Sequence, residues 1–472
     1  MDDPFDRARW PLPRLAAELD DLAVRSRPPQ GSVDMGAVDW AVDQLLDGAT
    51  PAELCEAALW VGVRRGRADG RGPEGLVTHA VLGAAACRSL GAQPALPLDE
   101  RAAATAAVQH VAYTLGAYRG GVNDEQEGPR VLAWFEPGEP PGDPLLAFHH
   151  AVAAGECDLA DHRWLDAARL DPVAAEEALI SAGAAGYHLN EHKLVYPAQV
   201  RSWIGEDAEV DPVLFRVAAR YAGNHLQDPA RADTRRADAA ALVVEADDRG
   251  RGAAGDLERV SVVATGIART PQKQLTPLLM GSLADGLDPA DLVLAVSLVT
   301  ASRCSATPFG GAGPIGAVHA GTGANAVRRC MARTDVPELR YELAICSTES
   351  PQLRRLARVE ELAVPPYDDG ALEDLLDALA DGDPDAASDA ACAVPPDDVE
   401  SIRTAWAAVL STAATDQWML LHGIKHAVAM YEDFSATSHP ARIWYLAAAA
   451  RTAAHATAMD QPVAREVERR LG

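Results

Sequence analysis

Apolar side chains recur every three or four positions along most of this chain, between clusters of small and polar residues. The pattern is clearest in residues 102–118, 213–223 and 441–459, where Ala and other strong helix formers fill the remaining positions. One face of a helix repeats at that spacing, so the pattern predicts helices. Alternating β-branched strands are nearly absent, and residues 261–268 (SVVATGIA) are the best short candidate. We therefore predict a mainly α fold.

Comparison of the chain with itself indicates two related halves. Residues 45–65 can be laid on residues 283–303 without a gap, with nine of 21 positions identical. The shared Asp-Gly and Pro predict a turn into a helix N-terminus. Three further blocks recur in the same order: residues 72–80 with 313–320, 187–192 with 421–426, and 211–212 with 439–440. We predict an internal duplication with pseudo-twofold symmetry.

The length of 472 residues is natural for two or three domain-sized units. Residues 227–257 are polar and charged, which predicts a connector with one short helix inside it. Residues 359–402 hold 14 Asp and Glu and no Lys or Arg, which predicts an acidic loop or surface helix. The predicted organisation is an N-terminal extension (1–30), a first helical half (31–226), the connector, and a second half (258–472) that contains the acidic insertion.

Charge and cysteine usage narrow the class of protein. The formal net charge of −27 repels polyanions, so we expect no nucleic acid partner. The sequence has no uninterrupted run of about 18 apolar residues, so we expect no membrane span. The first residues do not resemble a secretory signal. Seven scattered cysteines with no Cys-x-x-Cys pair suit a reducing compartment rather than a disulfide framework or a thiolate zinc site. We expect a cytoplasmic protein, and a homo-oligomer is compatible with the sequence.

Histidines carry the candidate chemistry. Two histidines four apart on a helix project from one face, so a His-x-x-x-His pair can hold one ion. A third imidazole completes a three-histidine site with an open position for water, dioxygen or substrate. Whether two such trios form one dinuclear centre or two mononuclear sites is left open by the sequence. Six of the 13 histidines occupy equivalent places and are the predicted ligands: His79, His188, His192, His319, His422 and His426.

Other ionisable side chains adjoin the two pairs. Only three lysines occur among 42 basic residues, and two of them, Lys193 and Lys425, lie beside these histidines. A compact amine is not equivalent to a guanidinium, so this placement favours a role in proton transfer. Surface ion pairing is the alternative role. The predicted catalytic residues are Glu191, Lys193, Tyr196, Lys425 and Tyr431, with Asp416, Glu432 and Asp433 as further supporting groups.

The paired His-x-x-x-His arrangement at 188/192 and 422/426 is similar in ligand count to the type 3 copper proteins, tyrosinase and haemocyanin. Their two histidine trios bind dioxygen between coppers, so the resemblance implies oxidation chemistry by analogy. It departs in the third histidine, which here lies more than 100 residues upstream. The blocks around His79, His319 and 422–434 also resemble a bacterial family of uncharacterised helical proteins, which supplies no activity.

Two other motifs predict less. His188-Leu-Asn-Glu-His192 spells the His-x-x-Glu-His signature of inverzincin peptidases, but Lys425 stands where the second half would need a Glu. Residues 311–316 match Gly-x-Gly-x-x-Gly and resemble the nucleotide loop of zinc-containing alcohol dehydrogenases. A nucleotide loop needs a buried strand before it and a helix after it. The residues before this motif have little strand character, and Gly321 and Gly323 weaken a following helix. We expect a turn that delivers His319, and no nucleotide.

The sequence therefore predicts a metal-dependent oxidase or oxygenase that acts on a small organic molecule, in specialised metabolism. Imidazole ligands suit copper or non-haem iron, with zinc and hydrolysis as the alternative. Dioxygen is a candidate co-substrate. A helical binding or scaffold protein with structural histidines is the other interpretation.

Overall fold

The computed structural model describes residues 13–25, 33–65, 79–91, 98, 100–120, 142–205, 208–224, 228–249, 254–309, 313–364, 366–415, 421–459 and 461–472. These residues contain 22 α-helices, three short 3-10 helices and no strand, which confirms the mainly α prediction. The strand candidate 261–268 was wrong. It lies in a helix, because Val260, Ala264 and Ile267 are buried at helical spacing.

The first half of the chain contributes α1 (Arg14–Arg25), α2 (Met35–Leu46), α3 (Pro51–Arg65), α4 (His79–Gly91), α5 (Glu100–Gly120), α6 (Pro144–Ala154), α7 (Cys157–Leu170), α8 (Pro172–Gly186), α9 (His192–Ile204), α10 (Pro212–Ala222) and α11 (Pro229–Arg249). The second half contributes α12 (Leu257–Arg269), α13 (Leu275–Ala284), α14 (Pro289–Ala306), α15 (Gly313–Arg333), α16 (Pro337–Cys346), α17 (Ala371–Asp381), α18 (Pro384–Ala393), α19 (Val399–Ala413), α20 (His422–Ser435), α21 (Ile443–Thr457) and α22 (Pro462–Leu471). None of these helices is long and apolar enough to cross a membrane, and the seven cysteines form no disulfide.

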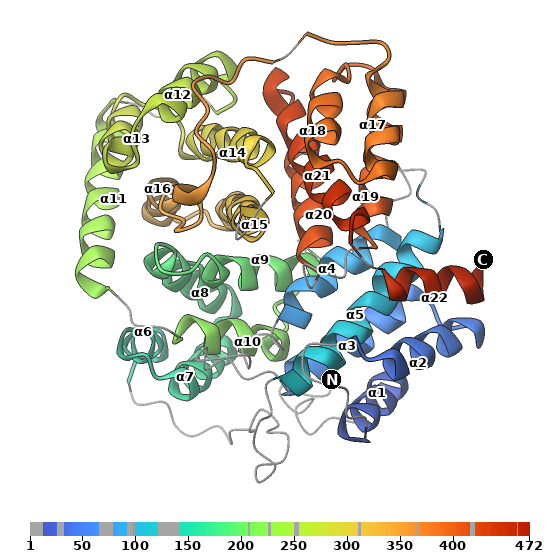
Figure 1. Ribbon diagram of the computed structural model, residues 1–472. Helices are drawn as coiled ribbons and strands as arrows, with labels where there is room; N and C mark the ends of the chain where they lie inside the picture. Colours follow the sequence, from blue (N-terminus) through green and yellow to red (C-terminus); the bar gives the residue numbers. More distant parts are fainter. Residues whose placement is uncertain are drawn as a thin grey trace.

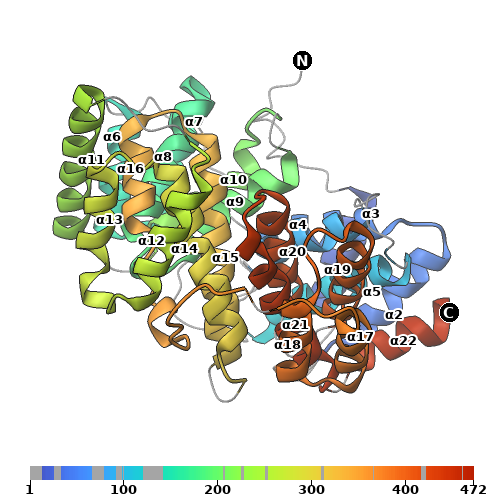
Figure 2. The same cartoon turned by 90° about the horizontal axis from the view of Figure 1, so that it is seen from above.

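The helices form two lobes that do not follow the predicted division into halves (Figure 1). Helices α6–α16 make one lobe, and α1–α5 join α17–α22 in the other. A view at 90° keeps the same separation (Figure 2). Each half of the chain therefore contributes to both lobes, and long-range packing holds the two ends of the chain together.

Several packing contacts of the first eleven helices recur in the second eleven. Helix α3 packs on α5 as α14 packs on α16, and α7 packs on α10 as α18 packs on α21. The two turns matched in sequence also have the same backbone. Ala49 N–H donates to the Gln44 carbonyl, and Leu287 N–H donates to that of Ser282. Both turns use a glycine with left-handed φ, and Pro starts the next helix in each, as predicted.

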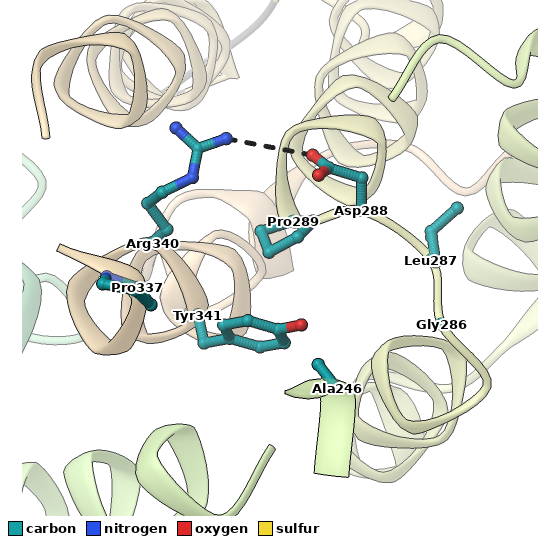
Figure 3. Close-up of a pocket in the computed structure, with 8 residues that line it drawn as sticks. All are labelled: Ala246, Gly286, Leu287, Asp288, Pro289, Pro337, Arg340 and Tyr341. Atoms are coloured by element: carbon teal, nitrogen blue, oxygen red, sulfur yellow. Dashed lines mark ion pairs between the residues drawn. The ribbon is translucent and has the colours of Figure 1, made fainter. Parts of the chain in front are cut away.

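The second of these turns is closed by α16. Arg340 Nη2 lies 3.9 Å from Asp288 Oδ1, and Tyr341 lies beside Pro289 around a small hollow (Figure 3). The hollow measures about 30 Å³, which holds water but no larger ligand. The hollow is therefore a packing gap between the turn and α16 and not a ligand site.

Two segments with unusual charge are more ordered than their composition indicates. The connector contains the 21-residue helix α11, longer than the one short helix expected, because Ala239, Leu242 and Ala246 form a buried stripe. The acidic insertion contains α17 and α18, which pack on α21 through buried residues that include Leu375 and Ala391. In both segments a narrow apolar face is enough to dock a helix whose other faces are charged.

Four helices meet where the two lobes join. Helices α4 and α15 each contact both α9 and α20, so the four form a closed circuit. Gly321 and Gly323 do not interrupt α15, contrary to the expectation from sequence. A Cβ at Gly321 would lie 2.6 Å from His426 Nε2, and one at Gly323 would lie 2.8 Å from the Tyr187 hydroxyl. The missing side chains therefore let the α8–α9 turn and α20 approach α15 closely.

Replacement of Gly321 by Ala tests this close approach. The added methyl has no room beside the buried His426 ring, so we expect Gly321→Ala to lower the free energy of unfolding by about 1–3 kcal/mol. Urea denaturation measures the change. Gly281→Ala in α13 is the matched control, since nothing lies within 4 Å of its Cβ. Removal of a helical glycine there should stabilise by about 0.5–1 kcal/mol. Equal effects at both positions would contradict the packing argument.

Candidate metal centre

Four of the six predicted histidines meet at the junction of the lobes, one from each of the four central helices. His79, His192 and His422 are the first residues of α4, α9 and α20, and His319 lies within α15. Their ring centroids form a closed circuit, with 4.8 Å from His79 to His192 and 4.7 Å from His192 to His319. The circuit continues with 4.9 Å from His319 to His422 and 5.2 Å from His422 to His79. We call this set the four-histidine cluster.

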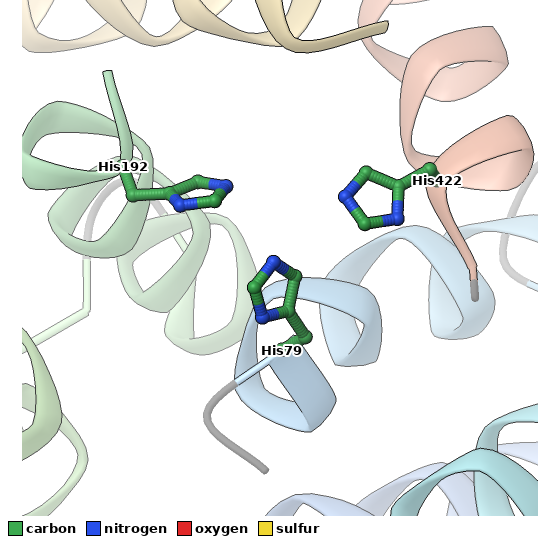
Figure 4. Close-up of side chains that lie close together, drawn as sticks. All are labelled: His79, His192 and His422. Carbon is green, nitrogen blue, oxygen red and sulfur yellow. The ribbon is translucent and has the colours of Figure 1, made fainter. Parts of the chain in front are cut away.

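Three members of the cluster point toward a common space (Figure 4). One ligand nitrogen from each of His79, His192 and His422 lies within 4.8 Å of the others. An ion bound at about 2.0–2.1 Å from each nitrogen would need them about 3.3 Å apart, so small inward rotations of the rings would complete a site. His79 and His192 are only 9% and 7% exposed. The donor set and its setting therefore fit a transition metal ion.

The fourth member, His319, is oriented by a carboxylate. Its Nδ1 lies 2.8 Å from Oε1 of Glu191, which is almost fully buried. An ionised carboxylate only accepts hydrogen bonds, so Nδ1 carries the proton and donates it. Nε2 is then the nitrogen available to a metal or a substrate. A carboxylate bonded to the far side of an imidazole is the usual outer partner in histidine metal sites.

His192 is held by two residues that the sequence analysis did not assign. The side-chain oxygen of Asn190 accepts the His192 backbone N–H at 2.9 Å, and its amide donates to the Tyr221 hydroxyl at 2.7 Å. That hydroxyl lies 3.4 Å from His192 Nδ1. The buried Arg216–Asp161 pair, with bonds of 2.9 and 3.0 Å, fixes α10 and thus Tyr221. The signal for Asn190 was present, because Asn just before an apolar run favours a helix start.

His422 follows a strained residue. Leu421 has φ of 66°, the only positive value among the described non-glycine residues. Its side chain covers Gly83 of α4, where a Cβ would lie 2.6 Å from Leu421 Cδ1. This conformation costs roughly 1–2 kcal/mol for a non-glycine residue. The strain is offset by packing that fixes the start of α20 against α4, beside His79.

The electrostatic setting keeps His422 neutral. Burial is the main cause that lowers the pKa of its imidazole well below the usual value, and the charge of Lys425 adds to the effect. A neutral imidazole has the lone pair that a metal ligand needs. His422 therefore presents a ligand-competent nitrogen without first losing a proton.

His188 lies outside the four-histidine cluster, and the prediction that it shares a helix with His192 was wrong. Helix α8 ends at Gly186 and α9 begins at His192, so His188 lies in the turn between them. Burial and the charges of Arg231 and Arg235 lower its pKa, which places it on the side of α11. Its two buried ring nitrogens have no hydrogen-bond partner among the described residues.

His426 shares α20 with His422, as predicted, but its ring is held elsewhere. Its Nδ1 lies 3.1 Å from the Thr452 hydroxyl, and its Nε2 edge faces Gly321. The side chain is fully buried, and burial lowers its pKa to about 3. These contacts describe a neutral core histidine that joins α15, α20 and α21.

The predicted catalytic residues are distributed unequally around the cluster. Glu191 contacts it directly, and the Tyr196 ring lies 6.2 Å from that of His192. Lys193 turns away and donates to the Ala222 carbonyl at 3.1 Å, and burial lowers its pKa to about 7. Lys425 is buried within electrostatic reach of His422.

The remaining polar candidates serve packing. Tyr431 packs on Trp406, with the two ring centroids 5.3 Å apart. Asp433 accepts bonds from Ser297 and Asn325, and Glu432 pairs with Arg329, so both tie α20 to its neighbours. Asp416 lies outside the described residues.

Comparison with known proteins supplies no assignment: no family model, curated protein or solved structure matches this chain. The meaning of the site depends on its own geometry and chemistry. The resemblances to a bacterial family and to type 3 copper proteins stay predictions.

The ligand set can be tested with Co²⁺, whose absorption reports coordination by protein nitrogens. We expect His192→Ala to weaken Co²⁺ binding by at least about 100-fold, because it removes a converging ligand. His188→Ala should leave affinity within about threefold, since that ring lies in the turn outside the cluster. Titration followed by visible absorption measures both, and circular dichroism confirms that both variants fold. Equal losses in the two variants would support the ligand trios predicted from sequence instead.

His426 gives a pH-dependent prediction. Its folded-state pKa of about 3 lies below the usual value of 6.5, so the unfolded chain binds more protons between these two values. Stability therefore rises with pH through this window and falls on acidification. We expect the metal-free protein to lose about 2 kcal/mol through this group between pH 7 and pH 5.

His426→Gln should remove that part of the pH dependence and keep a hydrogen bond to Thr452. Urea denaturation in EDTA at pH 7 and pH 5 makes the comparison. An unchanged slope in the variant would show that His426 is not held neutral by burial.

Proposed function

We propose that this chain is a metal-dependent enzyme in which His79, His192 and His422 hold one ion. The observation that supports this most strongly is the convergence of three ligand nitrogens, from three different helices, at a nearly buried junction. Buried polar groups that converge without a structural need are typical of functional sites. The convergence favours one shared centre over a separate site in each half.

The proposed reaction is oxidation or oxygenation of a small organic molecule. Imidazole ligands without thiolate suit copper or non-haem iron, with zinc as the alternative. A bound copper or iron ion would supply the one-electron chemistry that reactions of dioxygen require. The enclosed position of the ligands would keep bulk water from the reacting groups.

His319 is proposed to accept a proton during the reaction, and Glu191 is proposed to stabilise its protonated form. With Nδ1 bonded to the Glu191 carboxylate, neutral His319 can accept a proton at Nε2. The carboxylate then stabilises the imidazolium through a charge-assisted hydrogen bond. Tyr221 and Asn190 position His192, and they need not exchange protons themselves.

The repeated helix order supports the proposal that the two halves arose by duplication. In that order α4 corresponds to α15, and α9 corresponds to α20. His79 then pairs with His319, and His192 pairs with His422 rather than with His426. Each half would contribute one lone histidine and one helix-starting histidine to the four-histidine cluster.

The proposal is tested by metal content and dioxygen uptake on protein purified without a histidine tag. We expect about one copper or iron per chain after anaerobic loading, and uptake of dioxygen with ascorbate as electron donor above the rate of the free ion. Glu191→Gln should still bind the metal, with an affinity at most about 10- to 100-fold lower than that of the wild type. It should lower the rate of dioxygen uptake by about 100-fold. His188→Ala is the control with unchanged uptake.

Two outcomes would contradict this function. Zinc as the only tightly bound metal, with no dioxygen uptake, would favour a hydrolase. Absence of any stoichiometric metal after reconstitution would favour a helical binding protein with structural histidines.

A further inference from the structure

A basic pocket lies in the lobe formed by α6–α16, between the start of α11, the α12–α13 connection, α14 and the 3-10 helix at Leu353–Arg355. Its volume is about 410 Å³, within the usual range for small-molecule sites. No Asp or Glu lines it, although the chain has a net charge of −27. Six cationic side chains do: Arg231, Arg269, Lys273, Arg303, Arg354 and Arg358.

Arg303 is the unusual member of this set. It projects from α14, is only 6% exposed, and has no carboxylate within ion-pair distance among the described residues. Its Nη2 reaches only the carbonyls of Ile267 and Ala268, at 3.5 and 3.3 Å, and its buried Nε has no hydrogen-bond partner. A buried guanidinium left in this state is costly, because Coulomb attraction does not replace its lost hydration.

The surrounding cations add to the same positive field. In the part of the chain that the structure describes, Lys273, Arg354 and Arg358 form no ion pair. Burial lowers the pKa of Arg303, and the positive charge of Arg358 lowers it further. Arg231 and Arg269 do have partners, Glu349 at 2.7 Å and Glu361 at 3.6 Å. Four cations thus remain uncompensated around one hollow, in a chain rich in carboxylates that could have neutralised them.

We propose that the basic pocket binds a small molecule with a diphosphate or two separate phosphate groups. Four unpaired cations match the three or four negative charges of such a ligand. Planar guanidinium groups bond phosphate oxygens in pairs, and Lys273 adds a compact charge. A nucleic acid is disfavoured, because the net charge of −27 repels an extended polyanion while a small ligand meets mainly the local field.

The basic pocket is separate from the metal centre. Its lining comes from α11–α14, the α12–α13 connection and the segment around the 3-10 helix Leu353–Arg355, whereas the four-histidine cluster comes from α4, α9, α15 and α20. No residue is shared. The diphosphate site therefore stands whether or not the histidines bind a metal.

Isothermal titration calorimetry with sodium pyrophosphate tests the site on the full chain, after EDTA treatment and dialysis. We expect one pyrophosphate per chain, with affinity that falls as NaCl rises. Arg354→Ala and Lys273→Ala should each weaken binding at least tenfold, and Arg303→Met should abolish it. Arg355→Ala is the matched control, since Arg355 lies in the same 3-10 helix but does not line the pocket. His192→Ala should bind pyrophosphate like the wild type.

Lys273 and Arg354 are exposed, so their alanine variants keep the test informative if Arg303→Met does not fold. No measurable heat, or binding that Arg354→Ala and Lys273→Ala leave unchanged, would overturn the site. Citrate that binds as tightly as pyrophosphate would overturn the assignment to phosphate. Loss of binding in His192→Ala would place the anion at the histidines and overturn the separate pocket.

Discussion

Four imidazoles in mutual contact are the constraint on which the junction of the two lobes depends. Imidazoles whose ring centroids lie about 5 Å apart cannot all be positively charged, because like charges at this distance repel strongly where water is scarce. Glu191 bonds to His319, the Tyr221 hydroxyl lies beside His192, and a bound ion would supply a partner shared by several rings. Each imidazole comes from a different helix, so these requirements fix the relative positions of α4, α9, α15 and α20.

This arrangement couples the candidate chemistry to the fold. A metal ion that binds only the folded chain stabilises it by roughly 4 kcal/mol at a thousand times its Kd. The ligands His79 and His422 come from the lobe built by the two ends of the chain, and His192 comes from the other. Metal binding would then close the junction between the lobes as well as prepare a reactive centre.

Small residues make such a junction feasible. Gly83, Gly321 and Gly323 each lie where a methyl group would overlap a neighbour that positions the cluster. Loss of a side chain there costs helix propensity, and the gain is close packing of helices that carry polar groups. The uncompensated arginines of the basic pocket follow the same logic, since both places keep a locally unfavourable arrangement that a ligand would relieve.

The sequence by itself determined the helical class and the matched turns at Gly48 and Gly286, and it predicted His79, His192, His319 and His422 among six candidate ligands. Local physics governs these features, because helical periodicity, glycine at left-handed φ and proline after a turn act over a few residues. The tertiary structure alone decided which histidines meet. His188 lies in the turn between α8 and α9, and Thr452 together with Gly321 holds His426 outside the cluster. It also decided that the chain ends join in one lobe and that six distant cations line one pocket. Such contacts join residues far apart along the chain, and a pattern read over a few residues cannot specify them.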